Sequence, residues 1–137
     1  LNDGFQSLID TLKLDVLMID THPGLNEETL LSISISDVLA VLLRPDQQDY
    51  QGTAVTVEVA RKLDVPNMLL IVNKLPTIID ADEVKTRVES IYKCPVAGVI
   101  PHSDELMAMA SSGIFTLRFP DHPISARIKD IAEKIIA

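Results

Sequence analysis

The pentapeptide Asp20-Thr21-His22-Pro23-Gly24 directly follows a short apolar run, and its residue types suit phosphate chemistry. A carboxylate at the end of a buried strand can stand beside magnesium, usually through a water molecule. A glycine lets a backbone N–H approach a terminal phosphate closely. The same residues could instead be a strand-ending Asp that caps the next helix, followed by a Pro-Gly turn. Both readings stay open at this point.

Two further polar stretches, Asn73-Lys74 and Pro101-His102-Ser103-Asp104, follow later apolar runs. The planar amide of Asn73 offers one acceptor and two donors, which match the edge of a purine. Asn at a strand end is also a common turn residue. The second stretch equally suits a turn into a helix that Ser103 or Asp104 caps.

Four apolar runs must hold these stretches in place. They do not alternate apolar with polar residues, which is typical of strands covered on both faces, as in a parallel sheet. In such folds ligands bind at the carboxyl ends of the strands, so we expect the polar stretches at one edge of the sheet. The expected strands are Val16–Ile19, Val38–Leu43, Met68–Val72 and Val96–Ile100.

Helical patterns separate these runs. Asn26 is a cap candidate for a helix through Ile35, and Asp80 with Glu83 forms a capping pair for the next amphipathic segment. An isoleucine stripe predicts a last helix over Ile124–Ile136. The β-branched segment Asp46–Leu63 is also assigned as a helix, because it lies between two buried strands. The order predicts one α/β domain over residues 1–137, with three layers, a mostly parallel sheet and helices on both faces.

The order and spacing of the polar stretches resemble the MinD/ParA group of P-loop ATPases. The resemblance is carried by Asp15-Val-Leu-Met-Ile-Asp20-Thr-His-Pro-Gly24, by Asn73-Lys74, and by Gly98-Val-Ile-Pro101-x-x-Asp104-x-Leu106. It continues through Ser112-Gly113 and the last helix, so it spans nearly the whole chain.

The resemblance implies a role for each matched position. Asp20 would sit near magnesium, and the switch that senses the γ-phosphate would be formed by Thr21, His22, Pro23 and Gly24. Asn73, followed by Lys74, would read adenine, and the backbone after Pro101, at His102, would line the base pocket. His22 departs from the proline or small residue expected at its position. A titratable ring beside the γ-phosphate could alter hydrolysis or simply point to solvent, and the second is expected. ATP and Mg²⁺ are thus the cofactors implied for the intact parent protein.

The family's glycine-rich phosphate loop, which holds the phosphates and magnesium, has no counterpart here. The chain has five glycines, and the smallest gap between two of them, from Gly98 to Gly113, is 15 residues. The resemblance therefore implies an incomplete P-loop fold that lacks its N-terminal phosphate-loop unit. Phosphoryl transfer depends on positioning and on neutralising phosphate charge. We expect this chain alone neither to hydrolyse ATP nor to bind it tightly, with no cofactor bound and no catalytic residue of its own.

The absence of the phosphate loop also implies the absence of the strand that leads into it. In this family the strand leading into the phosphate loop lies between the Asp20-type strand and the next one. Either Val16–Ile19 pairs directly with Val38–Leu43, or a second chain fills the gap, so swapped self-association is expected. The start at Leu1, without methionine, also suggests a fragment of a longer parent, in which a protein partner is expected.

Composition narrows the class of protein. The net charge is −8 and twelve basic residues are scattered among twenty acidic ones, which argues against direct nucleic-acid binding. Cys94 is the only cysteine, so no internal disulfide can form, which fits a reducing compartment. No run is long enough to cross a bilayer, no signal segment is present, and Ile124–Ile136 lacks the features of a membrane anchor. A soluble, cytoplasmic protein is expected.

Three other functions compete with the ATPase-fragment reading. A relative that lacks the phosphate loop could serve as a protein-interaction module. A cobyrinic acid diamide synthase-type amidoligase would share the fold but needs a further glutamine-handling domain. A phosphoacceptor receiver domain needs a phosphorylatable Asp after the third strand, where Asn73 stands.

Overall fold

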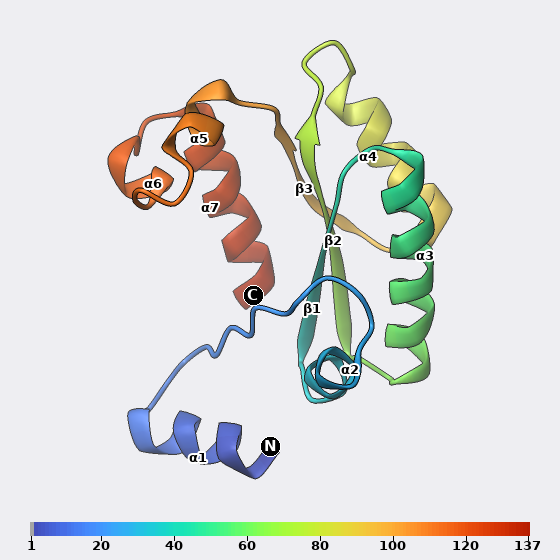
Figure 1. Ribbon diagram of the computed structural model, residues 1–137, viewed down its shortest axis with the longest axis vertical. Coiled ribbons are helices and arrows are strands. Elements are labelled where there is room, and N and C mark those ends of the chain that lie inside the picture. Colours follow the sequence, from blue (N-terminus) through green and yellow to red (C-terminus); the bar gives the residue numbers. More distant parts are fainter. Residues whose placement is uncertain (1) are drawn as a thin grey trace.

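The computed structural model describes the backbone of residues 2–137 and the side chains of residues 3–137 (Figure 1). Three strands and seven helices are assigned in this part of the chain. In order they are α1 (Asn2–Leu12), α2 (Glu27–Ser34), β1 (Val38–Leu43), α3 (Gln47–Lys62), β2 (Asn67–Leu75), α4 (Ala81–Tyr92), β3 (Val96–Pro101), α5 (Asp104–Met109), α6 (Phe115–Arg118) and α7 (Pro123–Ile136).

The strands form one parallel sheet in the order β1-β2-β3. β1 and β2 pair in register from Val38 opposite Asn67 to Leu43 opposite Val72. β2 lies in the middle, and Leu70 and Val72 are completely buried there. This matches the continuous apolar pattern of the run, because a strand with neighbours and helices on all sides meets no water.

Helices cover both faces of the sheet, as the sequence predicts (Figure 1). On one face, α3 and α4 contribute Val57, Val84, Val88 and Tyr92 to the larger core cluster. On the other face, Ile131 of α7 packs against Ile71 and Ala97. The domain is therefore three-layered, and the expected fold class is confirmed.

Side-chain caps begin helices α2, α3 and α4, and the caps at Asn26 and Asp80 are the ones predicted from the sequence. The side chains of Asn26, Asp46 and Asp80 each accept a hydrogen bond from a backbone N–H three residues later, at 2.8, 2.9 and 2.8 Å respectively. These bonds satisfy donors that the first turn of a helix otherwise leaves unpaired. The β-branched segment is indeed helix α3, and its buried side chains Thr53, Val57 and Ala60 lie on one helical face.

The predicted strand at Val16–Ile19 is wrong. This segment is neither helix nor strand, and 50% of Val16 and 76% of Met18 are exposed to solvent. An apolar run becomes a strand only when a neighbouring strand takes up its N–H and C=O groups. Among the described residues β1 pairs with β2 alone, so the direct pairing with Val38–Leu43 is also not formed.

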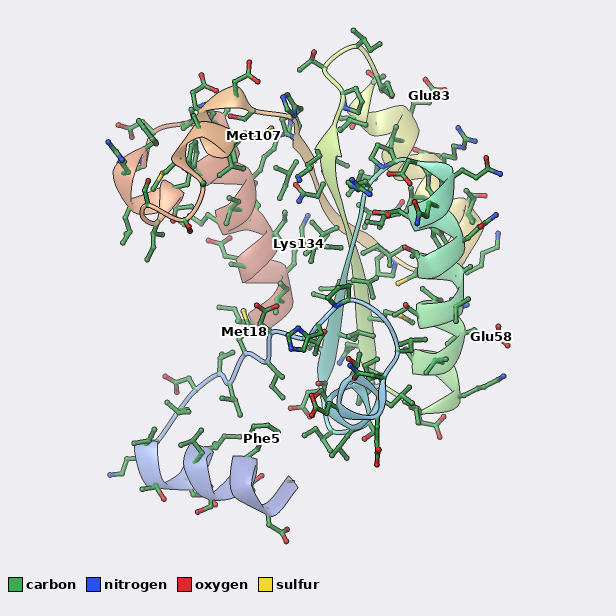
Figure 2. All side chains as sticks on the ribbon, viewed as in Figure 1. Phe5, Met18, Glu58, Glu83, Met107 and Lys134 are labelled. Atoms are coloured by element: carbon green, nitrogen blue, oxygen red, sulfur yellow. The ribbon has the colours of Figure 1, made fainter. Side chains whose placement is uncertain are left out.

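Helix α1 is an element that the sequence reading missed. Phe5, Leu8, Ile9 and Leu12 recur at helical spacing, so the signal was present. α1 stands apart from the sheet, at the end of the extended segment that carries Met18 (Figures 1 and 2). No helix among residues 2–137 is both long and apolar enough to cross a membrane.

Candidate functional site

A hollow of about 310 Å³ opens at the carboxyl ends of β2 and β3. Four residues predicted from the sequence line it, together with three that follow them along the chain. The seven are Asn73, Lys74, Pro101, His102, Ser103, Leu106 and Met107. The volume lies at the lower end of the range for small-molecule pockets. The position is the one at which open α/β sheets bind ligands.

A bulge in β2 gives the hollow its first wall. The β2–β3 register runs from Val72 opposite Val99 to Leu75 opposite Pro101, so Asn73 and Lys74 together face one residue of β3. Lys74 takes a left-handed backbone conformation with φ of 55°, which is uncommon for a residue with a Cβ. Bulges of this kind re-aim side chains at the rims of sheets. Asn73 is half-buried here, whereas Lys74 is exposed.

The amide of Asn73 is held by its own neighbour. The backbone N–H of Lys74 donates to Asn73 Oδ1 at 2.9 Å. This bond satisfies a donor that the bulge removes from the strand ladder. It also fixes the direction in which the amide faces, so the side chain is positioned before any ligand arrives.

The end of β3 forms the second wall. The backbone N–H of His102 donates to the carbonyl of Leu75 at 2.8 Å, which joins β3 to the end of β2. The chain then enters α5, and Ser103 is its N-cap: Ser103 Oγ accepts from the N–H of Leu106 at 3.1 Å. Of the two capping candidates, Ser103 or Asp104, the structure selects Ser103.

Two acidic residues of α5 do not line the hollow themselves but contact side chains that do. Asp104 Oδ1 lies 3.0 Å from His102 Nε2, and Ser103 Oγ donates to Glu105 Oε2 at 2.9 Å. The backbone N–H of Glu105 and the hydroxyl of Ser103 lower the pKa of the Glu105 carboxyl. Each carboxylate thus contacts one polar side chain of the hollow.

The pentapeptide from Asp20 to Gly24 does not reach this hollow. All five residues are exposed, and none lines the cavity. In Figure 1 the blue segment between α1 and α2 passes beside the lower part of the sheet, whereas β3 leads into α5 at the upper end. The expected common edge thus holds Asn73, Lys74, Pro101 and His102 and leaves out Asp20, Thr21, His22, Pro23 and Gly24.

The lost strand explains this separation. With Val16–Ile19 unpaired, nothing fixes Asp20 at the carboxyl edge of the sheet. No group of three or more possible metal ligands is found among the described residues, so the role of Asp20 beside magnesium stays a prediction. Gly24 does adopt a φ of 97°, a conformation that glycine allows and other residues rarely adopt.

Sequence reasoning did not single out Met107. It lies on α5, and Figure 2 shows it at the upper end of the molecule. The predicted helix cap at Ser103 could have indicated it, because the first turn of a helix that begins there lies close to the strand ends. The backbone of Lys74 gave no sequence signal at all.

A second hollow, of about 400 Å³, lies between α3 and α4. Its charged side chains already have partners. Arg61 donates to the carbonyls of Tyr92 and Lys93 at the end of α4, and Lys62 pairs with Glu58 at 3.1 Å. Capping the last carbonyls of a helix is a structural role, so this hollow is the weaker candidate.

The chain is similar to proteins of known name. It is 29% identical over 124 residues to an uncharacterised ATP-binding protein of Methanocaldococcus jannaschii, a match that covers 90% of this chain and 47% of that protein. It is 24% identical over 116 residues to a putative septum site-determining protein MinD of Emiliania huxleyi, covering 81% of this chain and 43% of that protein. The chain thus spans about half the length of these relatives. No family model matches it.

The fold has a counterpart among solved structures. The MinD cell division protein of Aquifex aeolicus superposes with a TM-score of 0.82 and 19% identity, over 98% of this chain and 58% of that one. This match covers almost the whole chain. The chain is thus similar in sequence to an ATP-binding protein and to a putative MinD, and it shares its fold with a MinD protein.

Proposed function

We propose that this chain supplies the base-binding part of the nucleotide site of a MinD/ParA-like ATPase. The observation that carries the proposal is the hollow at the ends of β2 and β3, where Asn73 and Pro101 stand together as the resemblance requires. The similarity to an ATP-binding protein and to MinD supports the same reading. ATP with Mg²⁺ is the proposed ligand of the whole protein, and ATP-dependent spatial positioning is its proposed process.

The phosphate-binding part of such a site is not found within these residues. The chain has no glycine-rich loop, and Lys74 is the only lysine or arginine that lines the hollow. Triphosphates carry several negative charges, which P-loop sites neutralise with lysine, magnesium and backbone N–H groups. We therefore propose that this chain by itself binds a nucleotide weakly, through the base, and does not hydrolyse it.

Nuclear magnetic resonance titration of the ¹⁵N-labelled chain with ATP tests the proposal. We expect backbone amide shifts at Asn73, Lys74 and the start of α5, with a Kd of roughly 1 mM or weaker. Added Mg²⁺ should change this affinity little, because the magnesium ligands of the phosphate loop are missing. Binding tighter than about 10 μM, or hydrolysis above background, would contradict the proposal that this chain alone binds nucleotide weakly and does not hydrolyse it.

Two asparagines on the same strand provide a matched pair of variants. Asn73→Ala should abolish the shifts. Asn67→Ala, at the opposite end of β2, should leave them unchanged, because Asn67 Nδ2 instead donates to the carbonyl of Asp37 at 3.3 Å. Shifts confined to the hollow between α3 and α4, and insensitive to Asn73→Ala, would contradict the assignment of the site.

A further inference from the structure

The four methionines of the chain stand in very different surroundings. Met107 is 57% and Met18 is 76% exposed to solvent, whereas Met109 is only 7% exposed. Met68 is partly buried and packs against the larger core cluster. A dissolved oxidant must reach the thioether sulfur before it can react, so Met107 and Met18 are the two accessible thioethers.

Of these two, Met107 lies at the candidate site. It lines the hollow at the ends of β2 and β3, whereas Met18 lies on the extended segment between α1 and α2 (Figure 2). The backbone N–H of Met107 donates to the carbonyl of Ser103 at 3.1 Å, so the first turn of α5 fixes its position. The apolar residues of the lining are Pro101, Leu106 and Met107.

Met109 provides a contrast within the same helix. It is buried in the core cluster that contains Phe115 and Ile124. A Cβ added at Gly113 would lie 2.9 Å from Met109 Cε, so this side chain is closely packed. Two positions along an α-helix are about 200° apart around its axis, so Met107 and Met109 point to nearly opposite sides of α5. An oxidant reaches the sulfur of Met109 only when the helix opens.

Hydrogen peroxide converts a methionine thioether into a sulfoxide. The sulfur attacks one peroxide oxygen and the O–O bond breaks. That oxygen stays on sulfur, and the other leaves as water after it takes up the proton of the transferred oxygen. Sulfur gives up two electrons, which reduce the peroxide. The product is polar and chiral, whereas the thioether is apolar and adapts to its surroundings.

We propose that Met107 is a reversible oxidation site that regulates ligand binding in this hollow. An aromatic base gains from contact with a thioether, whereas a sulfoxide oxygen must lose water before the base can approach. Oxidation therefore weakens binding. The inference rests on the proposed function in that the ligand is a nucleotide. The choice of Met107 rests only on the exposure and the place of the four methionines.

Peptide mass spectrometry after graded treatment with hydrogen peroxide tests the site, and fragment ions distinguish Met107 from Met109. We expect Met107 and Met18 to be oxidised about tenfold faster than Met109 or more, because Met109 reacts only in locally opened molecules. Burial raises the pKa of the Cys94 thiol, so this residue should react slowly. Equal rates for Met107 and Met109 would overturn the proposal.

Nuclear magnetic resonance titration with ATP before and after oxidation tests the regulation. The oxidised chain should bind about two- to tenfold more weakly, the effect of one contact between a thioether and an aromatic ring. Methionine sulfoxide reductases should restore the affinity. No loss of affinity in a chain whose Met107 is oxidised would overturn the proposal.

Two variants assign the effect to one sulfur. Met107→Leu keeps a similar volume but cannot form a sulfoxide, so its own affinity should be equal before and after peroxide. Met18→Leu removes the other exposed thioether and should keep the full loss. A loss that persists in Met107→Leu would overturn the proposal.

The outcomes separate this inference from the proposed function. Amide shifts with ATP at the start of α5 that oxidation of Met107 leaves unchanged would overturn the regulation and leave the nucleotide site standing. No response of the unoxidised chain to ATP would overturn the nucleotide site, and the regulation with it.

Discussion

At the scale of the residue, the backbone of Lys74 is the most unusual feature of the site. A left-handed conformation costs a residue with a Cβ about 1 kcal/mol relative to glycine, and such costs are often found at functional positions. Lys93 has nearly the same φ, 52° against 55°, but it ends helix α4, where a left-handed residue is common. Comparing the two lysines therefore distinguishes the effect of backbone strain at the site from its effect at an ordinary helix end.

The first prediction compares these two positions. Lys74→Gly and Lys93→Gly should each stabilise the fold by up to about 1 kcal/mol, because glycine adopts the conformation without a steric cost. Only Lys74→Gly should also weaken nucleotide binding, since it removes a cation that lines the hollow. Urea denaturation and nucleotide titration of both variants measure the two effects. Equal nucleotide affinities in the two variants would exclude a role for the Lys74 ammonium.

A second residue-scale prediction concerns Tyr92. Its side chain is buried, and its hydroxyl donates to the carbonyl of Tyr50 at 2.7 Å. Burial, and secondarily the nearby Tyr50, raises the pKa of Tyr92 to about 12 from an ordinary value of 10.0. The unfolded chain therefore ionises first as pH rises. The stabilising contribution is complete below about pH 10 and is lost between about pH 10 and 12, at about 1.4 kcal/mol per pH unit.

Tyr92→Phe should remove this part of the pH dependence. At neutral pH the variant should be about 1 kcal/mol less stable, because the carbonyl of Tyr50 loses its partner. The difference between the two free energies of unfolding should then shrink as the pH rises above about 10 and change sign before about pH 12. Parallel curves across the alkaline range would show that Tyr92 ionises in the folded protein as readily as in the unfolded chain.

At the scale of the element, close approach of β3 and α7 depends on one glycine. A Cβ added at Gly98 would lie 2.6 Å from Ile131 Cγ1 and 2.7 Å from Cδ1. Ile131 is itself buried, and α7 is held further by Lys134, whose Nζ donates to the carbonyl of Ala97 at 2.7 Å (Figure 2). The helix therefore has little freedom to move away.

Gly98→Ala should consequently destabilise the fold by about 1–3 kcal/mol, the usual cost of overpacking. Gly52→Ala is the matched control: Gly52 lies inside α3 with no heavy atom near the added methyl group. It should stabilise by about 0.5–1 kcal/mol, because alanine favours helix. Thermal unfolding of both variants measures these changes in stability. A stabilising Gly98→Ala would show that α7 can move away from β3 at little cost.

Elements with local signals were predictable from the sequence, and those that depend on a neighbour were not. The cap side chains Asn26 and Asp80 act within three residues, so the pattern alone placed the starts of two helices. The strand at Val16–Ile19 failed because pairing depends on a partner strand, which apolarity does not reveal. The bulge at Asn73-Lys74 depends on the register between β2 and β3. The orientation of the Asn73 amide could therefore not be predicted from the sequence.

At the scale of the whole molecule, the sheet has a free edge beside β1. β1 pairs with β2 on one side only among the described residues. Leu42 of β1 is 59% exposed, and the extended segment with Val16 and Met18 lies unpaired in the same chain. An exposed, apolar edge strand is a template for another strand. Each copy therefore carries both an open edge and a free apolar segment.

We expect two copies to exchange these parts, with Val16–Ile19 of one lying along β1 of the other. Light scattering coupled to size exclusion should give a mass above 15.0 kDa that rises with concentration. Leu42→Lys should shift the chain toward monomer, because a lysine on an edge strand opposes pairing. Leu117→Lys is the control, since Leu117 is 76% exposed but lies on α6, away from the edge. A 15.0 kDa monomer at high micromolar concentration would show that the free edge is closed in another way.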